Sequence, residues 1–124
     1  MNVELTEELL DRYKGGQIEV QNQLGGYLYH GGIEEIVLNG GVILEIQLAW
    51  KAVAQGYPPL AKSWERAEPT VYQAILMPGA VSDIGNDRLH FVSPTSADIV
   101  VLFLPGAARF DPSEVEGLLV QDSP

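Results

Sequence analysis

The sequence contains no cysteine, which excludes disulfide bonds, thiolate catalysis and cysteine-ligated metal sites. Positive charge is also scarce, because seven Lys and Arg residues stand against 17 Asp and Glu residues, for a net charge of −10. These basic residues are scattered along the chain. Binding to nucleic-acid phosphates or to an anionic membrane surface relies on clustered Lys and Arg, so the composition disfavours both partners.

Long apolar runs are missing as well. No stretch approaches the roughly 18 apolar residues that a membrane-spanning helix needs. The first residues, MNVELTEELL, are acidic and do not have the pattern of a signal peptide. We therefore expect a cytoplasmic protein with no membrane partner. With 124 residues, 46% of them hydrophobic, the chain predicts a single folded domain over residues 1–124.

Alternation of apolar and polar residues is what the sequence has in abundance. Residues 17–51 predict three consecutive β-strands, because side chains alternate with period two and glycine pairs separate the runs. The middle strand, residues 27–38, contains Gly31-Gly32 and loses its phase at Glu34-Glu35. Interior glycines and a phase slip predict a bend or a β-bulge.

A tight hairpin is predicted between the second and third strands. Asn39-Gly40-Gly41 separates two apolar runs, and Asn and Gly accept the positive φ that such a turn needs. In the third strand, residues 42–51, the alternation places Leu44, Leu48 and Trp50 on the same dry face.

The second half of the chain predicts further strands at residues 70–77, 88–92 and 98–104. Residues 52–69 are expected to form a loop or short excursion in which Trp64 packs back onto the fold. The run at 98–104, DIVVLFL, is apolar on both faces. One face of a strand in a small barrel normally meets water, so we expect helices or a second subunit to cover this strand.

Two short helices complete the predicted fold. Thr6 can cap a helix over residues 6–14, which Gly15 can end, and Asp111-Pro112 with Glu114 predicts the start of another. The fold class is therefore expected to be mainly β: a small, strongly bent antiparallel barrel with a short N-terminal and a short C-terminal helix.

A helix, a glycine and a bent second strand that ends in Asn resemble the Sm-like (LSm) fold over roughly the first half of the chain. Gly16, Gly31 and Asn39 stand in comparable positions, and residues 99–106, IVVLFLPG, resemble the strand before the family's second motif. The resemblance implies a five-strand barrel that assembles into a ring by strand pairing between subunits. Other SH3-like barrels fit nearly as well.

Two motif positions differ from the family pattern. Residues 36–38, Ile-Val-Leu, stand where the family has an aspartate upstream of Asn39, and Pro105-Gly106 replaces an Arg-Gly pair. In the family these residues hold RNA bases, so RNA binding enters only as an alternative.

Candidate metal ligands are few. Asp83, Asn86, Asp87 and His90 lie close together in SDIGNDRLH, but their spacing does not match an EF-hand loop, and a hairpin turn is the favoured interpretation. His30 and His90 are the only histidines, and no spacing motif links them to a zinc or iron site. Each is expected to be an outward or edge residue of its strand. We expect no cofactor.

Carboxylates and aromatics offer two weaker candidates. Glu34, Glu35 and Glu45 could meet across the hairpin as an acid–base pair, but adjacent strand residues point to opposite faces, which favours a solvated surface. For the aromatic side chains, packing in a core or interface is favoured over a pocket or a base-stacking surface. The aromatic set is Tyr27, Tyr29, Trp50, Tyr57, Trp64 and Tyr72.

We find no catalytic constellation in the sequence, which predicts a non-enzymatic assembly module that forms a homo-oligomer and binds an unidentified partner. An alternative is a small-ligand-binding barrel, or an enzyme built on one, with aromatic and carboxylate groups around residues 52–84. The candidate residues are Ile99, Val101 and Phe103 for the oligomer interface and Tyr27, Tyr29, Asn39 and Trp64 for binding.

Overall fold

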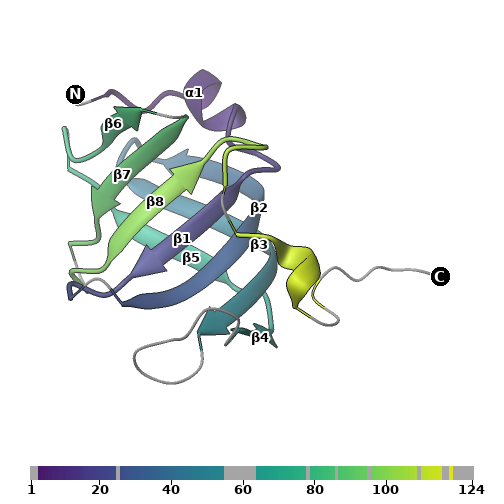
Figure 1. Ribbon diagram of the computed structural model, residues 1–124. Coiled ribbons are helices and arrows are strands. Elements are labelled where there is room, and N and C mark those ends of the chain that lie inside the picture. The colour runs from purple at the N-terminus through teal and green to yellow at the C-terminus, as the bar shows by residue number, and fades with distance from the viewer. Residues whose placement is uncertain are drawn as a thin grey trace.

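The computed structural model describes residues 3–24, 26–54, 64–77, 79–85, 87–94, 96–108, 110–115 and 118. Within them, eight strands form one antiparallel sheet, with the order β4-β3-β2-β1-β8-β7-β6 and with β5 also paired to β3 (Figure 1). The elements are α1 (Glu7–Asp11), β1 (Gln17–Gln21), β2 (Tyr27–Asn39), β3 (Ile43–Ala54), β4 (Trp64–Ala67), β5 (Val71–Ile75), β6 (Ser82–Gly85), β7 (Arg88–Val92), β8 (Ile99–Phe103) and the 3-10 helix η1 (Pro112–Glu114).

The N-terminal helix is present and capped as the sequence predicts. The Thr6 hydroxyl accepts a hydrogen bond from the Leu9 backbone N–H at 3.1 Å. The α-helix ends at Asp11, earlier than expected, and the chain leaves it through turns to Gly15 at φ +83°. Because Leu10 and Tyr13 are buried, the helix docks on one end of the curled sheet (Figure 1).

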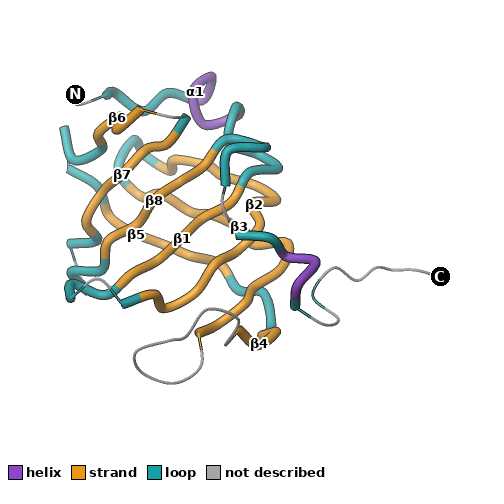
Figure 2. The backbone as a smooth tube through the Cα atoms, in the orientation of Figure 1, coloured by secondary structure: helices purple, strands orange, loops and turns teal. Residues whose placement is uncertain are grey.

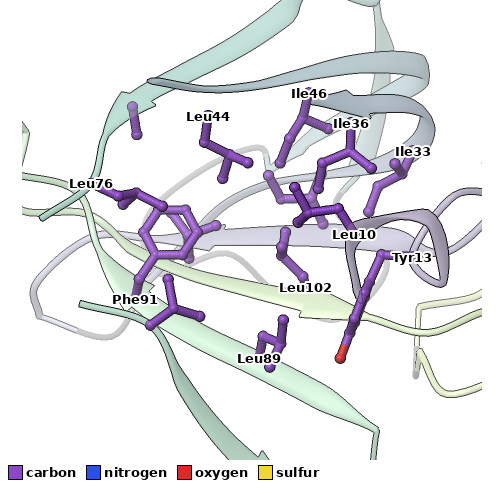
Figure 3. Packing of buried hydrophobic residues seen from close by; sticks show 14 of the residues in the cluster. Leu10, Tyr13, Ile33, Ile36, Leu44, Ile46, Leu76, Leu89, Phe91 and Leu102 are labelled. Carbon is purple, nitrogen blue, oxygen red and sulfur yellow. The ribbon is translucent and has the colours of Figure 1, made fainter. Parts of the chain in front are cut away.

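One hydrophobic core fills the inside of this sheet. Side chains from β2 and β3 point toward those of β7 and β8 across the interior (Figure 3). The largest fully buried members come from five elements and are Leu10, Ile18, Val20, Leu44, Ile46, Leu89, Phe91, Val100 and Leu102. Since alternate residues of each strand supply this core, the period-two pattern of the sequence is confirmed for β1, β3 and β7.

The bend in β2 is confirmed, and it changes the face of one tryptophan. The pairing of β2 with β3 shifts register between Gly32 and Ile33 and again between Ile33 and Glu35. Leu48 faces the inner core, whereas Trp50 packs with Phe110 on the opposite, outer face. The prediction that Trp50 shares the dry face of Leu48 is therefore wrong, because the bulge reverses the alternation between them.

Two other local predictions have different outcomes. The Asn39-Gly40-Gly41 hairpin is confirmed, with φ +60° at Gly40 and +79° at Gly41. The loop expected around Trp64 is wrong, because residues 64–67 form β4, paired with residues 51–54 of β3. Trp64 does pack back onto the fold, as expected.

The ends of the sheet are simpler than predicted. In the described part of the chain no pairing joins β5 to β6, so the sheet is open there. Where a C-terminal helix is expected, the described residues form the 3-10 helix η1, which ends at Glu114 and is followed by Val115 in extended conformation (Figure 2). Residues 116–117 and 119–124 lie outside the described part of the chain. The Asp111 carboxylate caps η1 by accepting a hydrogen bond from the Ser113 N–H at 3.0 Å, so the predicted capping role of Asp111 is confirmed. Val115 is extended and does not continue an α-helix. Among the described residues, no helix is long and apolar enough to span a bilayer.

Candidate functional site

A second, smaller apolar cluster lies on the outer face of the sheet, where the segment after β8 crosses β2 and β3 (Figure 1). Ala52 and Val115 are buried in it, with Trp50, Trp64 and Phe110 packed around them. We call this group, together with His30, the aromatic cluster.

Small residues on β2 and β3 make room for the rings. Gly32 lies opposite Trp50, and a Cβ atom at Gly32 would come within 2.3 Å of the Trp50 Nε1 atom. Ala52 lies opposite His30 and is fully buried. The Gln17 side chain on β1 donates a hydrogen bond to the Phe110 carbonyl at 3.3 Å and holds the covering segment against the sheet.

The rings form a compact stack centred on Phe110. The His30 and Phe110 centroids are 4.4 Å apart with the ring planes 10° from parallel. Trp64 stands edge-on to both, at 4.7 Å from His30 and 5.2 Å from Phe110. These are favourable geometries for aromatic pairs, and they join β2, β4 and the segment before η1 into one platform beside Trp50 and Ala52 of β3.

Burial makes His30 a neutral aromatic group. The side chain is 6% exposed, and desolvation lowers its pKa from 6.5 to about 4. The expected outward position of His30 is confirmed, because β2 directs it to the outer face. Its burial was not expected, and it arises because Phe110 stacks on the imidazole ring. At neutral pH the platform therefore carries no positive charge.

A pocket of about 320 Å³ opens at the edge of this platform. Trp64, Phe110 and Val115 supply apolar walls, and Glu114 supplies a carboxylate. The cap at Asp111 orders the turn that presents Glu114. An aromatic wall beside one carboxylate is the arrangement that accommodates a compact cation with apolar substituents.

The predicted binding residues do not form one site. Trp64 lies in the aromatic cluster, whereas Tyr29 packs against the inner core with the Lys51 Nζ atom 4.4 Å above its ring. Burial, with smaller contributions from Tyr72 and Asp98, raises the pKa of Tyr29. Asn39 lies at the hairpin end of β2, and the Tyr27 side chain lies outside the described part of the structure.

The predicted oligomer interface has a different environment from the one expected. Strand β8 is paired on both edges, with β1 and with β7, so its backbone cannot receive a strand from a second subunit. Val101 is 7% and Phe103 4% exposed within the single chain, and Ile99 is only half-buried. Val101 and Phe103 are therefore buried without a second chain, and an oligomer interface at this strand stays a prediction.

The acidic turn behaves as a hairpin. Asp83 Oδ1 accepts from the Gly85 N–H at 2.9 Å, and Asp87 has φ +61°, while Asn86 lies outside the described residues. His90 is paired with Ser82 and Val101 and does not meet His30 along this face. Within the described ranges, no group of three or more His, Asp or Glu residues is arranged to hold a metal ion.

The glutamates that the sequence places near the hairpin make separate contacts and do not form an acid–base pair. Glu45 accepts from the Asn39 amide at 2.6 Å and from the Gln73 amide at 2.7 Å. Glu35 pairs with Lys14 at 3.1 Å. These contacts on a solvated surface support the structural interpretation over an acid–base pair.

Sequence reasoning missed His30, Phe110 and Glu114 as members of a site. The signal available was the run of small residues around His30, because Gly31-Gly32 leaves space on the sheet for a ring from elsewhere in the chain. Comparison of the chain with family models, with curated proteins and with solved structures gives no match. The function is therefore inferred from the geometry of the site and from the charge of the chain.

Proposed function

We propose that this chain is a non-enzymatic binding module whose aromatic pocket holds a small organic cation, or the cationic side chain of a partner. The observation that supports this best is the pocket itself, in which Trp64 and Phe110 form the walls beside the Glu114 carboxylate. Ring faces attract cations through their quadrupole, and a neighbouring carboxylate adds a Coulombic attraction.

Charge elsewhere in the chain favours the same class of ligand. The net charge is −10, which raises the local concentration of cations around the molecule. Neutral His30 does not oppose an incoming positive charge. Val115 offers apolar contact to alkyl groups on the cation.

The small-barrel type is part of this proposal. A helix before β1, Gly31 within the bent β2 and Asn39 at its end are features in favour of an Sm-like or SH3-like architecture. The pairing of β7 with β8 departs from the Sm-like pattern, because the ring assembly implied by the resemblance needs an unpaired strand edge at that position. RNA binding remains the lesser alternative, and it predicts salt-sensitive affinity for short single strands.

Choline and its uncharged carbon isostere, 3,3-dimethyl-1-butanol, provide the direct test. Both fill the same volume, and only choline carries a charge. We expect choline to bind about 5- to 10-fold more tightly, as measured by calorimetry and by tryptophan fluorescence at constant ionic strength. Equal affinity for the two compounds would contradict a cation site.

Two matched variants locate the binding. Glu114→Gln removes the pocket carboxylate and should weaken choline binding several-fold while leaving the butanol unaffected. Glu8→Gln removes the same charge from the exposed first turn of α1 and should leave both affinities unchanged. Equal losses in the two variants would mean that only the overall charge attracts the ligand.

A further inference from the structure

The edge strands of the sheet differ in how they are protected against pairing with another chain. Strand β4 carries Glu65 and Arg66, and β6 carries Asp83 with a register shift between Asp83 and Gly85. Charges and bulges are the usual means by which natural edges avoid adding a strand. Strand β5, VYQAI, has no charge, no proline and a regular register with β3.

The backbone of β5 presents a row of outward-facing groups. Leu48 N–H donates to the Thr70 carbonyl at 3.2 Å, and Leu76 N–H donates to the Val42 carbonyl at 2.7 Å. These bonds mark the even-numbered residues of this segment as the ones that face β3. In an antiparallel ladder the alternate residues face the other way, so Val71, Gln73 and Ile75 direct their N–H and C=O groups away from β3.

The side chains of the same residues leave this edge accessible. Val71 is 55% and Ile75 51% exposed, and both lie on the outer face of the sheet. Between them, the Gln73 amide donates to Glu45 on β3 and so leans inward, away from the edge. Among the described residues, β5 has β3 as its one hydrogen-bonded neighbour.

We propose that β5 of one copy pairs with β5 of a second copy, antiparallel and about a two-fold axis at Gln73. In this register Gln73 faces its own equivalent, and Val71 of each copy faces Ile75 of the other. The three opposed pairs form about six inter-chain hydrogen bonds, two for each pair. The two sheets join into one continuous sheet, and both apolar pairs gain a cross-strand contact.

A second copy is the occupant that we infer, because β5 is self-complementary and lies in an uncharged segment of a strongly charged chain. Two chains of net charge −10 repel each other over most of their surfaces. Residues 69–82, PTVYQAILMPGAVS, contain no Asp, Glu, Lys or Arg, so β5 adds no charge of its own to the joined edge. The Glu45 carboxylate beside it on β3 accepts a hydrogen bond from the Gln73 amide. The β5 strand is also self-complementary about its centre, with β-branched residues at both outer positions. This inference goes beyond the proposed ligand binding and does not depend on the aromatic pocket.

Sedimentation over a concentration series, from micromolar to millimolar, tests the dimer. We expect a monomer–dimer equilibrium that tightens as salt screens the repulsion between copies. Ile75→Lys should weaken the dimer at least 10-fold, because it places a charge at the joined edge. Val92→Lys adds the same charge at a 49% exposed position on β7 and should leave the dimer intact. A monomer at all concentrations would overturn the proposal and leave the edge to a strand from another protein.

The absence of cysteine allows a test of the register. Gln73→Cys should form a disulfide-linked dimer under mild oxidation, because opposed residues at the two-fold axis have Cα atoms within disulfide range. Val92→Cys should remain monomeric on reducing-agent-free gels. Cross-linking of both variants to the same extent, or of neither in a sample shown to be dimeric, would overturn pairing through β5.

Discussion

The inner and outer faces of the curled sheet are packed in different ways. The inner core is a continuous hydrophobic cluster supplied by α1 and most of the strands, with alternate residues of each strand pointing inward. The outer aromatic cluster has few buried side chains and depends on one segment, around Phe110 and Val115, which lies over β2 and β3. The difference indicates that the inner face determines stability, whereas the outer face offers a shaped site whose loss the fold could tolerate.

Truncation of two neighbouring residues on β8, one from each face, tests this difference between the faces most directly. Leu102 is 1% exposed in the inner core, and Val101 is 7% exposed on the outer face. Leu102→Ala should lower the free energy of unfolding by about 3 kcal/mol, and Val101→Ala by about 1 kcal/mol, because the inner cavity cannot collapse as readily. Urea unfolding with unchanged m-values measures both. Equal losses would show that the two faces are equally important for stability.

The pH dependence of stability tests the burial of His30. Its pKa in the folded chain is about 4, below the 6.5 of an ordinary histidine, so the unfolded chain binds the proton more readily between these pH values. The stability that His30 contributes is therefore fully present above about pH 6.5 and is lost as the pH falls toward 4. The difference between the two pKa values corresponds to about 3 kcal/mol as an upper limit.

His30→Phe removes this titration and keeps a ring against Phe110. Below pH 6.5, the variant should lose stability less steeply than the unmodified chain, as followed by urea unfolding at a series of pH values. Between pH 7 and 9 the two curves should run parallel, which serves as the internal control. Parallel curves over the whole range would contradict the burial of His30.

The two adjacent glycines of β2 also test the difference between the faces, because Gly31 faces the inner core and Gly32 faces the outer aromatic cluster. A Cβ atom at Gly31 would lie 3.0 Å from the Leu48 methyl groups, and one at Gly32 would lie 2.3 Å from the Trp50 indole. Gly31→Ala should cost about 1 kcal/mol and leave tryptophan fluorescence unchanged. Gly32→Ala should displace Trp50, shift the fluorescence and weaken choline binding. A spectral change in Gly31→Ala alone would reverse the assignment of faces.

The sequence predicts most strands, the Thr6 cap and the bend in β2 because these depend on local periodicity and turn chemistry. The sequence does not predict which outward-facing side chain is covered by another segment of the chain. Phe110 meets His30 across 80 positions of sequence, and no local pattern records that contact. The two-sided apolar run of β8 predicts that something covers the strand, but strand order cannot be derived from alternation, so the pairing with β1 and β7 is not predicted.

Part of the candidate site was nevertheless within reach of sequence reasoning. Trp64 was expected to pack back onto the fold, and it does so from β4. The alternative of a small-ligand pocket places the carboxylate around residues 52–84, whereas the pocket beside Trp64 has Glu114 from η1. The start signal at Asp111 predicted an ordered turn there but not the surface on which it would dock.

The hydrogen bond from Gln17 to the Phe110 carbonyl fastens the proposed binding surface onto the sheet, whose last described strand in the sequence is β8. Because this bond uses the backbone of residue 110, the side chains of the covering segment at residues 110–115 can vary without removing it. Selection could exchange the rings and carboxylate of this strap, and so retune the preferred ligand, without the folding penalty that usually accompanies new specificity.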